Sequence, residues 1–394
     1  MSHGQLKYEI TGELFRRGRE VGKGGQKTVS ECQVQGHVVG IVENPEPDYG
    51  DRTFKLLAWP VGIAAQKYHA FPVDRVIDAC GRVVGIVMPR RDGRKFTELL
   101  SGLTRPDWLD DQLLLEIFSE LALAVNAANA AGYLIGDLNP ENVVFTNDGD
   151  VAILDCDSFF HTALDQVFPT TVGVAEYLAP ELQKFHREGR LAEAQRTLGG
   201  DSYAFATILF TAVMEGNHPF ANQDAIPVAE LIEAGTWPHR GAAGPQPRRC
   251  CPRLEDIPLE LADLFRTTFD HGLMNAKARP SMNEWYCCLK QLSQSAGSAA
   301  NAPPVPRPVK KQQTHNQSAA TTNPASVKPE LSMMEFLVGL SSGAAILWFT
   351  APLFSYLPAL AMEMLGVNEV KDAPKIWTDL QRVDDVSDSE GVTK

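Results

Sequence analysis

The sequence predicts an α+β protein, with a strand-rich amino-terminal part followed by a larger helical part. Residues 17–42 and 83–88 contain short runs rich in β-branched residues, bounded by Gly- and Pro-containing turns, which is the pattern of strands. Residues 110–131, and much of 200–292, instead carry apolar residues at helical spacing. A chain of 394 residues is long enough for such a domain and for additional segments.

The first strands enclose a glycine-rich turn, which reads Gly-Lys-Gly-Gly-Gln-Lys-Thr-Val over residues 22–29. Small residues allow backbone N–H groups to approach phosphate oxygens closely. The turn is therefore a candidate phosphate-binding loop, although an ordinary β-turn would have a similar composition. The candidate nucleotide-binding residues here are Gly22, Gly24, Gly25 and Val29.

Two further elements are predicted between the turn and the helical part. Residues 52–70 favour a short helix, which we expect to be interrupted near residues 60–62 by a proline and a glycine. The apolar runs 143–145 and 151–154 flank Asn-Asp-Gly at 147–149, which predicts a tight β-hairpin.

Polar residues lie on both sides of this hairpin. Asp137 and Asn142 precede it at a spacing of D-x-x-x-x-N, and Asp155 follows it. In phosphoryl transfer, an Asp accepts the proton of the substrate hydroxyl, while an Asn and a second Asp hold magnesium ions on the phosphates. One such pair is a weak motif, but the series in this order is specific. We therefore predict Asp137 as the base, with Asn142 and Asp155 as Mg²⁺ ligands.

This series resembles the protein kinase superfamily, and within it the bacterial eukaryotic-like Ser/Thr kinases. The resemblance covers roughly residues 10–295. It implies a bilobal fold, with a small β-rich N-lobe at about 10–88, a helical C-lobe at about 93–295, and ATP between them. The matching landmarks are Gly-Asp-Leu-Asn-Pro at 136–140, Asp-Cys-Asp-Ser-Phe at 155–159, Ala-Pro-Glu at 179–181, Asp201, Gly-Asn-His-Pro-Phe at 216–220 and Arg279-Pro280.

The resemblance also assigns a role to Lys27. Protein kinases carry a phosphate-binding Lys on their third strand, but Ile41 or a neighbour occupies that position here. Lys27 lies in the glycine-rich turn, as in the with-no-lysine kinases, whose motif is G-x-G-x-x-K-T-V. Since the chemistry requires only an ammonium near the α- and β-phosphates, we expect Lys27 to supply it. The alternative is an exposed surface lysine in a pseudokinase.

Other expected site residues follow from the same resemblance. Met88 and Arg90, on either side of a proline, match the hinge that receives adenine, and Asn139 replaces the Lys that often steadies the transferred phosphoryl group. We interpret Asp157 as a turn residue rather than as a further ligand. Glu181 and Arg279 are expected to form a buried ion pair that braces the C-lobe.

The departures from the family pattern lie beside these residues. Ile135 and Gly136 replace the His and Arg that usually precede the catalytic Asp. The acidic partner of the phosphate-binding lysine is not identified, because Glu43, Glu46, Asp48 and Asp51 are all possible.

Composition excludes some classes of protein and favours others. A net charge of −13 with no long basic run argues against a nucleic-acid partner. The seven Cys residues include no C-x-x-C pair, which argues against a zinc site and favours a reducing, cytosolic environment. The amino terminus has no apolar signal region.

The carboxy-terminal residues change composition twice. Residues 296–331 are polar and rich in Pro, which predicts a disordered linker. Residues 336–362 contain no charged side chain and exceed the roughly 20 apolar residues of a membrane span. The alternative is a buried or interfacial helix docked on a partner. Residues 363–394 form an acidic tail. Since ATP is cytosolic, we expect a cytoplasmic domain anchored to the inner membrane by a single carboxy-terminal span.

The predicted reaction is the transfer of the γ-phosphoryl group of Mg-ATP to Ser or Thr of a protein substrate. One alternative is a pseudokinase that binds partners at the membrane with weak or no catalysis. Another is a small-molecule kinase of related fold, because such enzymes also carry an Asp and an Asn at this spacing.

Overall fold

The structure is a computed structural model that describes residues 5–24, 27–58, 63–100, 108–161, 173–241 and 244–300. The chain divides into two units, residues 1–303 and 304–394, and all of the described residues belong to the first. The predicted apolar helix at 336–362 and the acidic tail lie outside the described residues.

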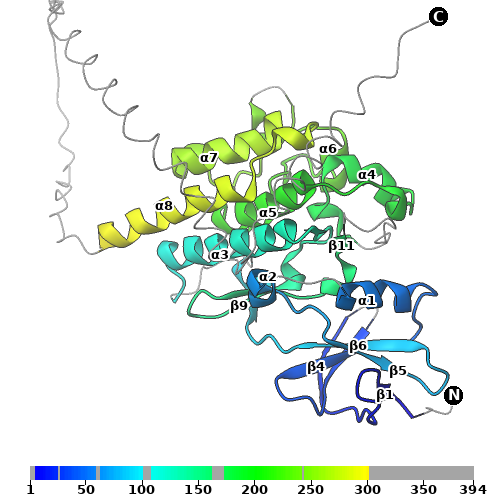
Figure 1. The fold of residues 1–394 in the computed structure, drawn as a ribbon. Coiled ribbons are helices and arrows are strands. Elements are labelled where there is room, and N and C mark those ends of the chain that lie inside the picture. The colour runs from blue at the N-terminus through cyan, green and yellow to red at the C-terminus, as the bar shows by residue number, and fades with distance from the viewer. Residues whose placement is uncertain are drawn as a thin grey trace, which may run out of the picture. The chain divides into compact units, whose positions relative to one another are not determined.

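A six-stranded antiparallel sheet forms the amino-terminal part, with strand order β1-β5-β6-β4-β3-β2 (Figure 1). The central strands β4 and β6 are buried along most of their length, as their Val- and Ile-rich sequences predict. The strands of this sheet are β1 (Lys7–Tyr8), β2 (Glu20–Lys23), β3 (Lys27–Glu31), β4 (His37–Val42), β5 (Asp74–Ile77) and β6 (Val83–Pro89).

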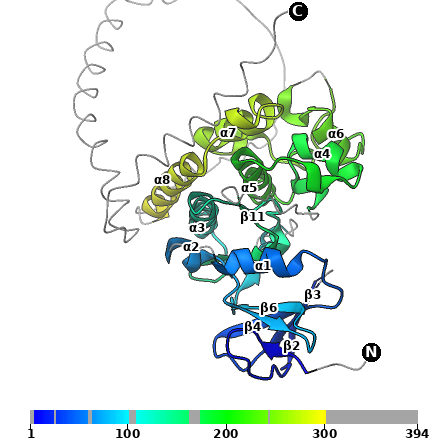
Figure 2. The ribbon, with the colours of Figure 1, turned by 45° about the vertical axis from the view of Figure 1, so that its right-hand side comes forward.

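Two short helices, α1 (Tyr49–Ala58) and α2 (Ile63–Tyr68), lie between the sheet and the helical part in both views (Figures 1 and 2). A small apolar core forms where Tyr49 packs with Ile86 and Met88 of the sheet. Helix α1 therefore faces the region where the two parts of the molecule meet.

The carboxy-terminal part is mainly helical, and the α+β prediction is confirmed for the described residues. Its core surrounds α5, which is buried over nearly its whole length, and α8 packs along α3. Helix α8 extends five residues into the segment that we predict as a linker. The helices here are α3 (Asp111–Ala130), α4 (Pro180–Arg187), α5 (Leu198–Val213), α6 (Val228–Glu233), α7 (Leu259–Arg266) and α8 (Met282–Ala300).

Helix α3 begins at an Asp cap, because the Asp110 carboxylate accepts a hydrogen bond from the Leu113 N–H at 2.7 Å. Within the described residues it is the one helix whose length and hydropathy would suit a membrane span. Ile117, Phe118 and Leu121 on this helix are fully buried in the core of the domain.

Short strands at the boundary between the two parts carry the residues of the candidate site. The predicted hairpin is present, because β9 (Val143–Phe145) pairs with β10 (Val151–Ile153). The N–H of Leu154 donates to the carbonyl of Asn142 at 2.7 Å. The segment before the hairpin therefore lies beside the segment after it. The remaining strands are β7 (Arg94–Lys95), β8 (Tyr133–Leu134) and β11 (Phe160–His161).

Candidate active site

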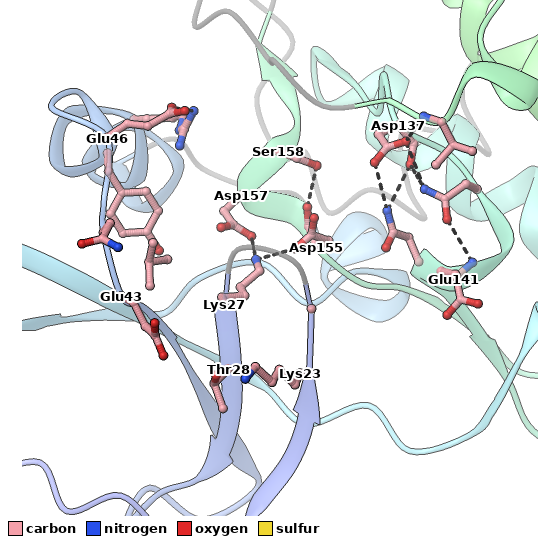
Figure 3. A pocket seen from close by; sticks show the side chains of 18 of the residues that line it. Lys23, Lys27, Thr28, Glu43, Glu46, Asp137, Glu141, Asp155, Asp157 and Ser158 are labelled. Atoms are coloured by element: carbon pink, nitrogen blue, oxygen red, sulfur yellow. Dashed lines mark hydrogen bonds and ion pairs between the residues drawn. The ribbon is translucent and has the colours of Figure 1, made fainter.

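A cavity of about 920 Å³ opens between the sheet and the helical part. Its walls come from the glycine-rich turn, from α1 and the loop before it, and from the two acidic segments on either side of the β9–β10 hairpin (Figure 3). The structure thus brings together residues that are far apart in the sequence. The predicted site residues that line the cavity are Gly24, Lys27, Asp137, Asn139, Asn142 and Asp155.

Lys27 points from the start of β3 into this cavity, and its side chain is only 14% exposed. Its ammonium is ion-paired with the carboxylates of both Asp155 and Asp157 (Figure 3). Burial alone would lower the pKa of Lys27, but the charges of Asp157 and Asp155 outweigh it and raise the pKa above its usual value. The ammonium is therefore fixed, charged and inside the cavity.

Asp157 lies in a tight 3₁₀ turn at Cys156–Ser158, and Asp155 lies just before it. Asp155 precedes the turn with φ of +60° and ψ of 35°, in the left-handed region that residues other than Gly seldom adopt. The hydroxyl of Ser158 donates to the carbonyl of Asp155 at 2.8 Å and stabilises this conformation. Burial raises the pKa of Asp155, and the charge of Lys27 opposes that rise.

Asp137 lies on the opposite wall, where amide groups orient its carboxylate. Asn139 donates to Oδ1 of Asp137 at 3.0 Å, and the N–H of Val174 donates to the same oxygen at 3.3 Å. Asn142 donates to the backbone carbonyl of Asp137 at 3.2 Å. Burial raises the pKa of Asp137. A half-buried, oriented carboxylate with a raised pKa is suited to accept a proton near neutral pH.

The backbone before Asp137 is held by one group from helix α5 and by one from the segment just before it. The buried carboxylate of Asp201 accepts hydrogen bonds from the N–H groups of Ile135 and Gly136, both at 3.0 Å. Arg196 donates to the carbonyl of Gly136 at 2.9 Å. Gly136 has a φ of +69°, so the Gly found here in place of the usual Arg suits this backbone. The sequence did not indicate Arg196, because no local pattern relates it to Gly136.

The ion pair predicted between Arg279 and Glu181 is present, but only Arg279 is buried, because Glu181 lies at the surface. Two nitrogens of the fully buried Arg279 guanidinium donate to the two carboxylate oxygens of Glu181, at 2.9 and 2.7 Å. The same guanidinium donates to the backbone carbonyls of Gly199, Gly272 and Leu273. This bidentate contact joins α4 to the segment just before α8.

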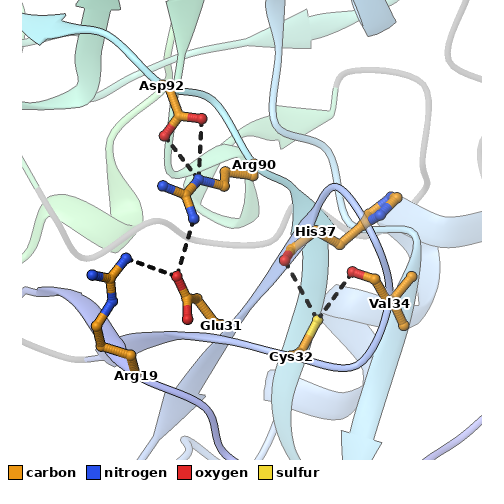
Figure 4. Close-up of polar contacts among 7 residues, drawn as sticks. All are labelled: Arg19, Glu31, Cys32, Val34, His37, Arg90 and Asp92. Carbon is orange, nitrogen blue, oxygen red and sulfur yellow. Dashed lines mark hydrogen bonds and ion pairs between the residues drawn. The ribbon is translucent and has the colours of Figure 1, made fainter.

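The two predicted adenine-binding residues are not part of the cavity lining. Met88 is buried at the end of β6. The side chain of Arg90 turns away to Asp92 and Glu31, at 2.8 and 3.3 Å (Figure 4). The backbone N–H of Arg90 donates to the carbonyl of Gly36 at 2.9 Å, so only its own carbonyl is left for the predicted contact with adenine.

Two other residues of the glycine-rich turn have defined positions in the sheet and the cavity. Gly22 lies on β2 and pairs with Val29 of β3. Gly24 lines the cavity, and its N–H donates to the carbonyl of Lys27 at 2.9 Å. Gly25 lies outside the described residues.

Helix α1 contributes two cavity residues that sequence reasoning missed. The ring of Tyr49 is buried, and no hydrogen-bond partner is found for its hydroxyl among the described residues. The guanidinium of Arg52 lies over this ring, 5.7 Å from the centroid, and pairs with Glu46 at 3.4 Å. Their spacing of three residues places Tyr49 and Arg52 on one face of a helix. The sequence does not show that this face lines a cavity.

The donor set of the cavity fits magnesium that is bound together with a nucleotide. Within the described residues, no group of three or more His, Cys, Asp or Glu side chains could hold a metal alone. The cavity does present the carboxylate of Asp155 and the side chain of Asn142. Mg²⁺ is usually held by one or two carboxylates together with water and substrate phosphates, so this small set of oxygen ligands is sufficient.

The proteins to which this chain is similar in sequence are named as kinases. No protein-family model matches the chain. The protein kinase YegI of Escherichia coli O157:H7 is 26% identical over 302 residues, which cover 73% of this chain and 46% of that protein. YegI of Escherichia coli K12 is 25% identical over 303 residues, with the same coverage. The chain thus spans less than half the length of these two relatives.

Shorter and structural matches agree with this relationship. A probable serine/threonine-protein kinase PknB of Lactococcus lactis is 29% identical over 141 residues, which cover 34% of this chain and 21% of that protein. The ROP18 kinase domain, solved with AMP-PNP and sucrose, has a TM-score of 0.52 at 16% identity, covering 76% of this chain and 87% of that one.

The autoinhibited serine kinase domain of titin has a TM-score of 0.53 at 14% identity, covering 71% of this chain and 81% of that one. At such low identity the two structures establish the fold, a β-sheet region followed by a helical region. The sequence relatives supply the homology. The chain is therefore homologous to the bacterial protein kinase YegI, and its fold is that of protein kinase domains.

Proposed function

We propose that this protein transfers the γ-phosphoryl group of Mg-ATP to a Ser or Thr hydroxyl of a protein substrate. The observation that carries the proposal is the convergence of Lys27, Asp137, Asn142 and Asp155 on one cavity. Phosphoryl transfer depends mainly on positioning and on charge stabilisation, and these four side chains supply both. The names of the relatives, protein kinase and serine/threonine-protein kinase, support the choice of substrate.

Each of these residues has a distinct role in the proposed reaction. Asp137 accepts the proton of the attacking hydroxyl, in an orientation set by Asn139. Asn142 and Asp155 hold magnesium, and the ammonium of Lys27 binds phosphate oxygens. Bound Mg²⁺ would neutralise the negative charge that builds up on the transferred group.

Gly24 and its neighbours in the turn cover the phosphates. Met88, near the end of β6, and the backbone carbonyl of Arg90, just after it, border the adenine.

Transfer of radiolabelled phosphate from ATP to the protein itself and to a general acceptor protein tests this proposal. The wild-type protein is expected to incorporate phosphate in the presence of Mg²⁺, and Asp137→Ala is expected to lose nearly all incorporation. Nucleotide binding without any transfer would instead favour the pseudokinase. Phosphorylation of an amino sugar, with no protein acceptor found, would favour the small-molecule kinase.

We also propose that residues 336–362 anchor the protein to the inner membrane, with the kinase domain in the cytoplasm. The absence of charged residues from this segment supports the assignment. Membrane fractionation should find the full chain in the pellet and residues 1–331 in the soluble fraction. Equal distribution of the two forms would rule out this anchor.

A further inference from the structure

We propose that Asp157 is the positioning residue for Lys27 and takes the part that a carboxylate on the N-lobe helix has in other protein kinases. This inference rests on the proposed function, since it concerns the lysine that binds the phosphates. In protein kinases, a Glu of this helix pairs with the phosphate-binding Lys, and the position of the helix controls the pair. Here α1 occupies the corresponding place between the sheet and the helical part (Figure 2).

Helix α1 does not offer an acid to Lys27. The residues that it turns towards the cavity are Tyr49 and Arg52, a ring and a cation. Asp51, in the first turn of the helix, is exposed and does not line the cavity. Glu46, in the loop before the helix, pairs with Arg52 and its side chain is 47% exposed.

The acids that do contact Lys27 are Asp155 and Asp157, and their environments differ. The Asp155 side chain is 30% exposed and that of Asp157 is 11% exposed. Asp155 is the residue proposed to bind magnesium, and a metal ion competes with the ammonium for its oxygens. Figure 3 shows both carboxylates at the Lys27 ammonium. The one that can stay with Lys27 when Asp155 binds magnesium is therefore Asp157.

The backbone explains how two acids so close in sequence reach one cation. The left-handed conformation of Asp155 and the 3₁₀ turn that follows it aim both carboxylates at β3. Tyr49 packs close enough to this pair that burial, followed by the charge of Asp157, raises the pKa of its hydroxyl. The position of Lys27 is therefore set by the turn at 155–158, and displacement of α1 alone would leave the ion pair intact.

Kinetic comparison of variants in the full chain tests this assignment. Asp157→Asn is expected to lower kcat/KM for ATP by about 10- to 100-fold, the range found when a residue that orients a ligand is removed. Asp157→Glu should recover part of the loss. The double variant Lys27→Met with Asp157→Asn should be no worse than Lys27→Met, because both changes remove the same interaction. Asp51→Asn is the matched control and should retain wild-type kcat/KM.

A second measurement needs neither nucleotide nor turnover. The rate at which an amine-acylating reagent modifies Lys27, followed by mass spectrometry, should rise several-fold in Asp157→Asn and stay unchanged in Asp51→Asn. Melting temperatures of the variants will show whether the fold is retained.

The outcomes separate this inference from the proposed function. An active wild type whose Asp157→Asn variant keeps full kcat/KM and an unchanged acylation rate would overturn the role of Asp157 alone. A loss of activity in Glu46→Gln that matches Asp157→Asn, with Lys27 acylation rising in both, would overturn it in favour of Glu46. A wild type that does not bind Mg-ATP would refute the proposed function, while the acylation rates would still decide whether Asp157 holds Lys27.

Discussion

The Cδ atom of Lys27 lies 3.2 Å from the place that a Cβ atom on Gly40 would occupy. Gly40 is on β4, beside β3 in the sheet, and the same Cβ would lie 3.3 Å from Cε of Met88. The missing side chain of Gly40 thus gives the long side chain of Lys27 a path across the sheet. The position of the Lys27 side chain on β3 therefore depends on the absence of a side chain at Gly40 on β4.

We therefore expect side-chain size at position 40 to control nucleotide binding. Gly40→Val should lower the affinity for Mg-ATP about as much as Lys27→Met does, because the added methyl groups would displace the lysine. Gly40→Ala should have a much smaller effect, since the atoms that it meets are movable parts of Lys27 and Met88. Titration with a fluorescent ATP analogue measures both.

Gly50→Ala is the control for this series, because its Cβ would make only an ordinary contact with Val83 at 3.6 Å. Equal affinities of Gly40→Val and wild type would show that Lys27 does not need this path.

The proposed base gives a prediction about turnover. Asp137→Asn keeps the size of the side chain and removes its ability to take a proton. We expect kcat to fall by about 100- to 10,000-fold, the usual contribution of a positioned general base, with little change in KM for ATP. Steady-state kinetics with Asp148→Asn, an exposed acid in the β9–β10 turn, supplies the comparison. A fall of less than tenfold in kcat would remove Asp137 from this role.

Gly136 gives a prediction about stability. Its φ of +69° is unfavourable for a residue with a Cβ atom, at roughly 1–2 kcal/mol. Gly136→Ala should lower the free energy of unfolding by about that amount, measured by denaturant titration. Gly200→Ala, on helix α5 with only a 3.6 Å contact to Thr197, should be neutral or slightly stabilising. The same strain predicts that Gly136→Arg, which restores the residue usual in the family, destabilises the protein.

His69 makes stability depend on pH. Burial lowers the pKa of this histidine from 6.5 to about 4, and the nearby Arg91 adds to the effect. The unfolded chain therefore binds a proton before the folded protein does. The contribution of His69 to the free energy of unfolding is fully present above pH 6.5. It decreases as the pH falls towards 4 and changes no further below that. The full loss corresponds to about 3 kcal/mol at 1.36 kcal/mol for each pKa unit.

His69→Asn is the variant that measures this effect, because an Asn amide can still donate to the carbonyl of Ala65, which His69 Nδ1 contacts at 2.7 Å. Between pH 7 and 4, the free energy of unfolding of the variant should fall less steeply than that of the wild type. Parallel pH profiles would mean that His69 does not titrate in this range.

The elements with a local signature were predictable from the sequence. The strands on either side of the glycine-rich turn, the long helix α3 and the β9–β10 hairpin follow from periodicity and turn chemistry. The interrupted helix predicted within 52–70 corresponds to α1 and α2. Their order along the chain, together with the spacing of Asp137 and Asn142, was enough to indicate a kinase-like fold.

The contacts that depend on tertiary structure were not predictable. We interpreted Asp157 as a turn residue; it does lie in a turn, but its carboxylate also contacts Lys27, 130 positions earlier. Tyr49 and Arg52 line the cavity because of the way α1 packs, and no sequence spacing relates them to Asp157. A left-handed Asp155 has no signature in the sequence, yet it decides where two carboxylates point.

The ion pairs of Lys27 also link the two parts of the domain. The cation belongs to the sheet, whereas Asp155 and Asp157 belong to the segment that leads into the helical part. A single ammonium therefore fastens one lobe to the other, and hinge opening must separate it from two anions. Salt screens exposed charges more than enclosed ones, so a high salt concentration would weaken these ion pairs only slightly.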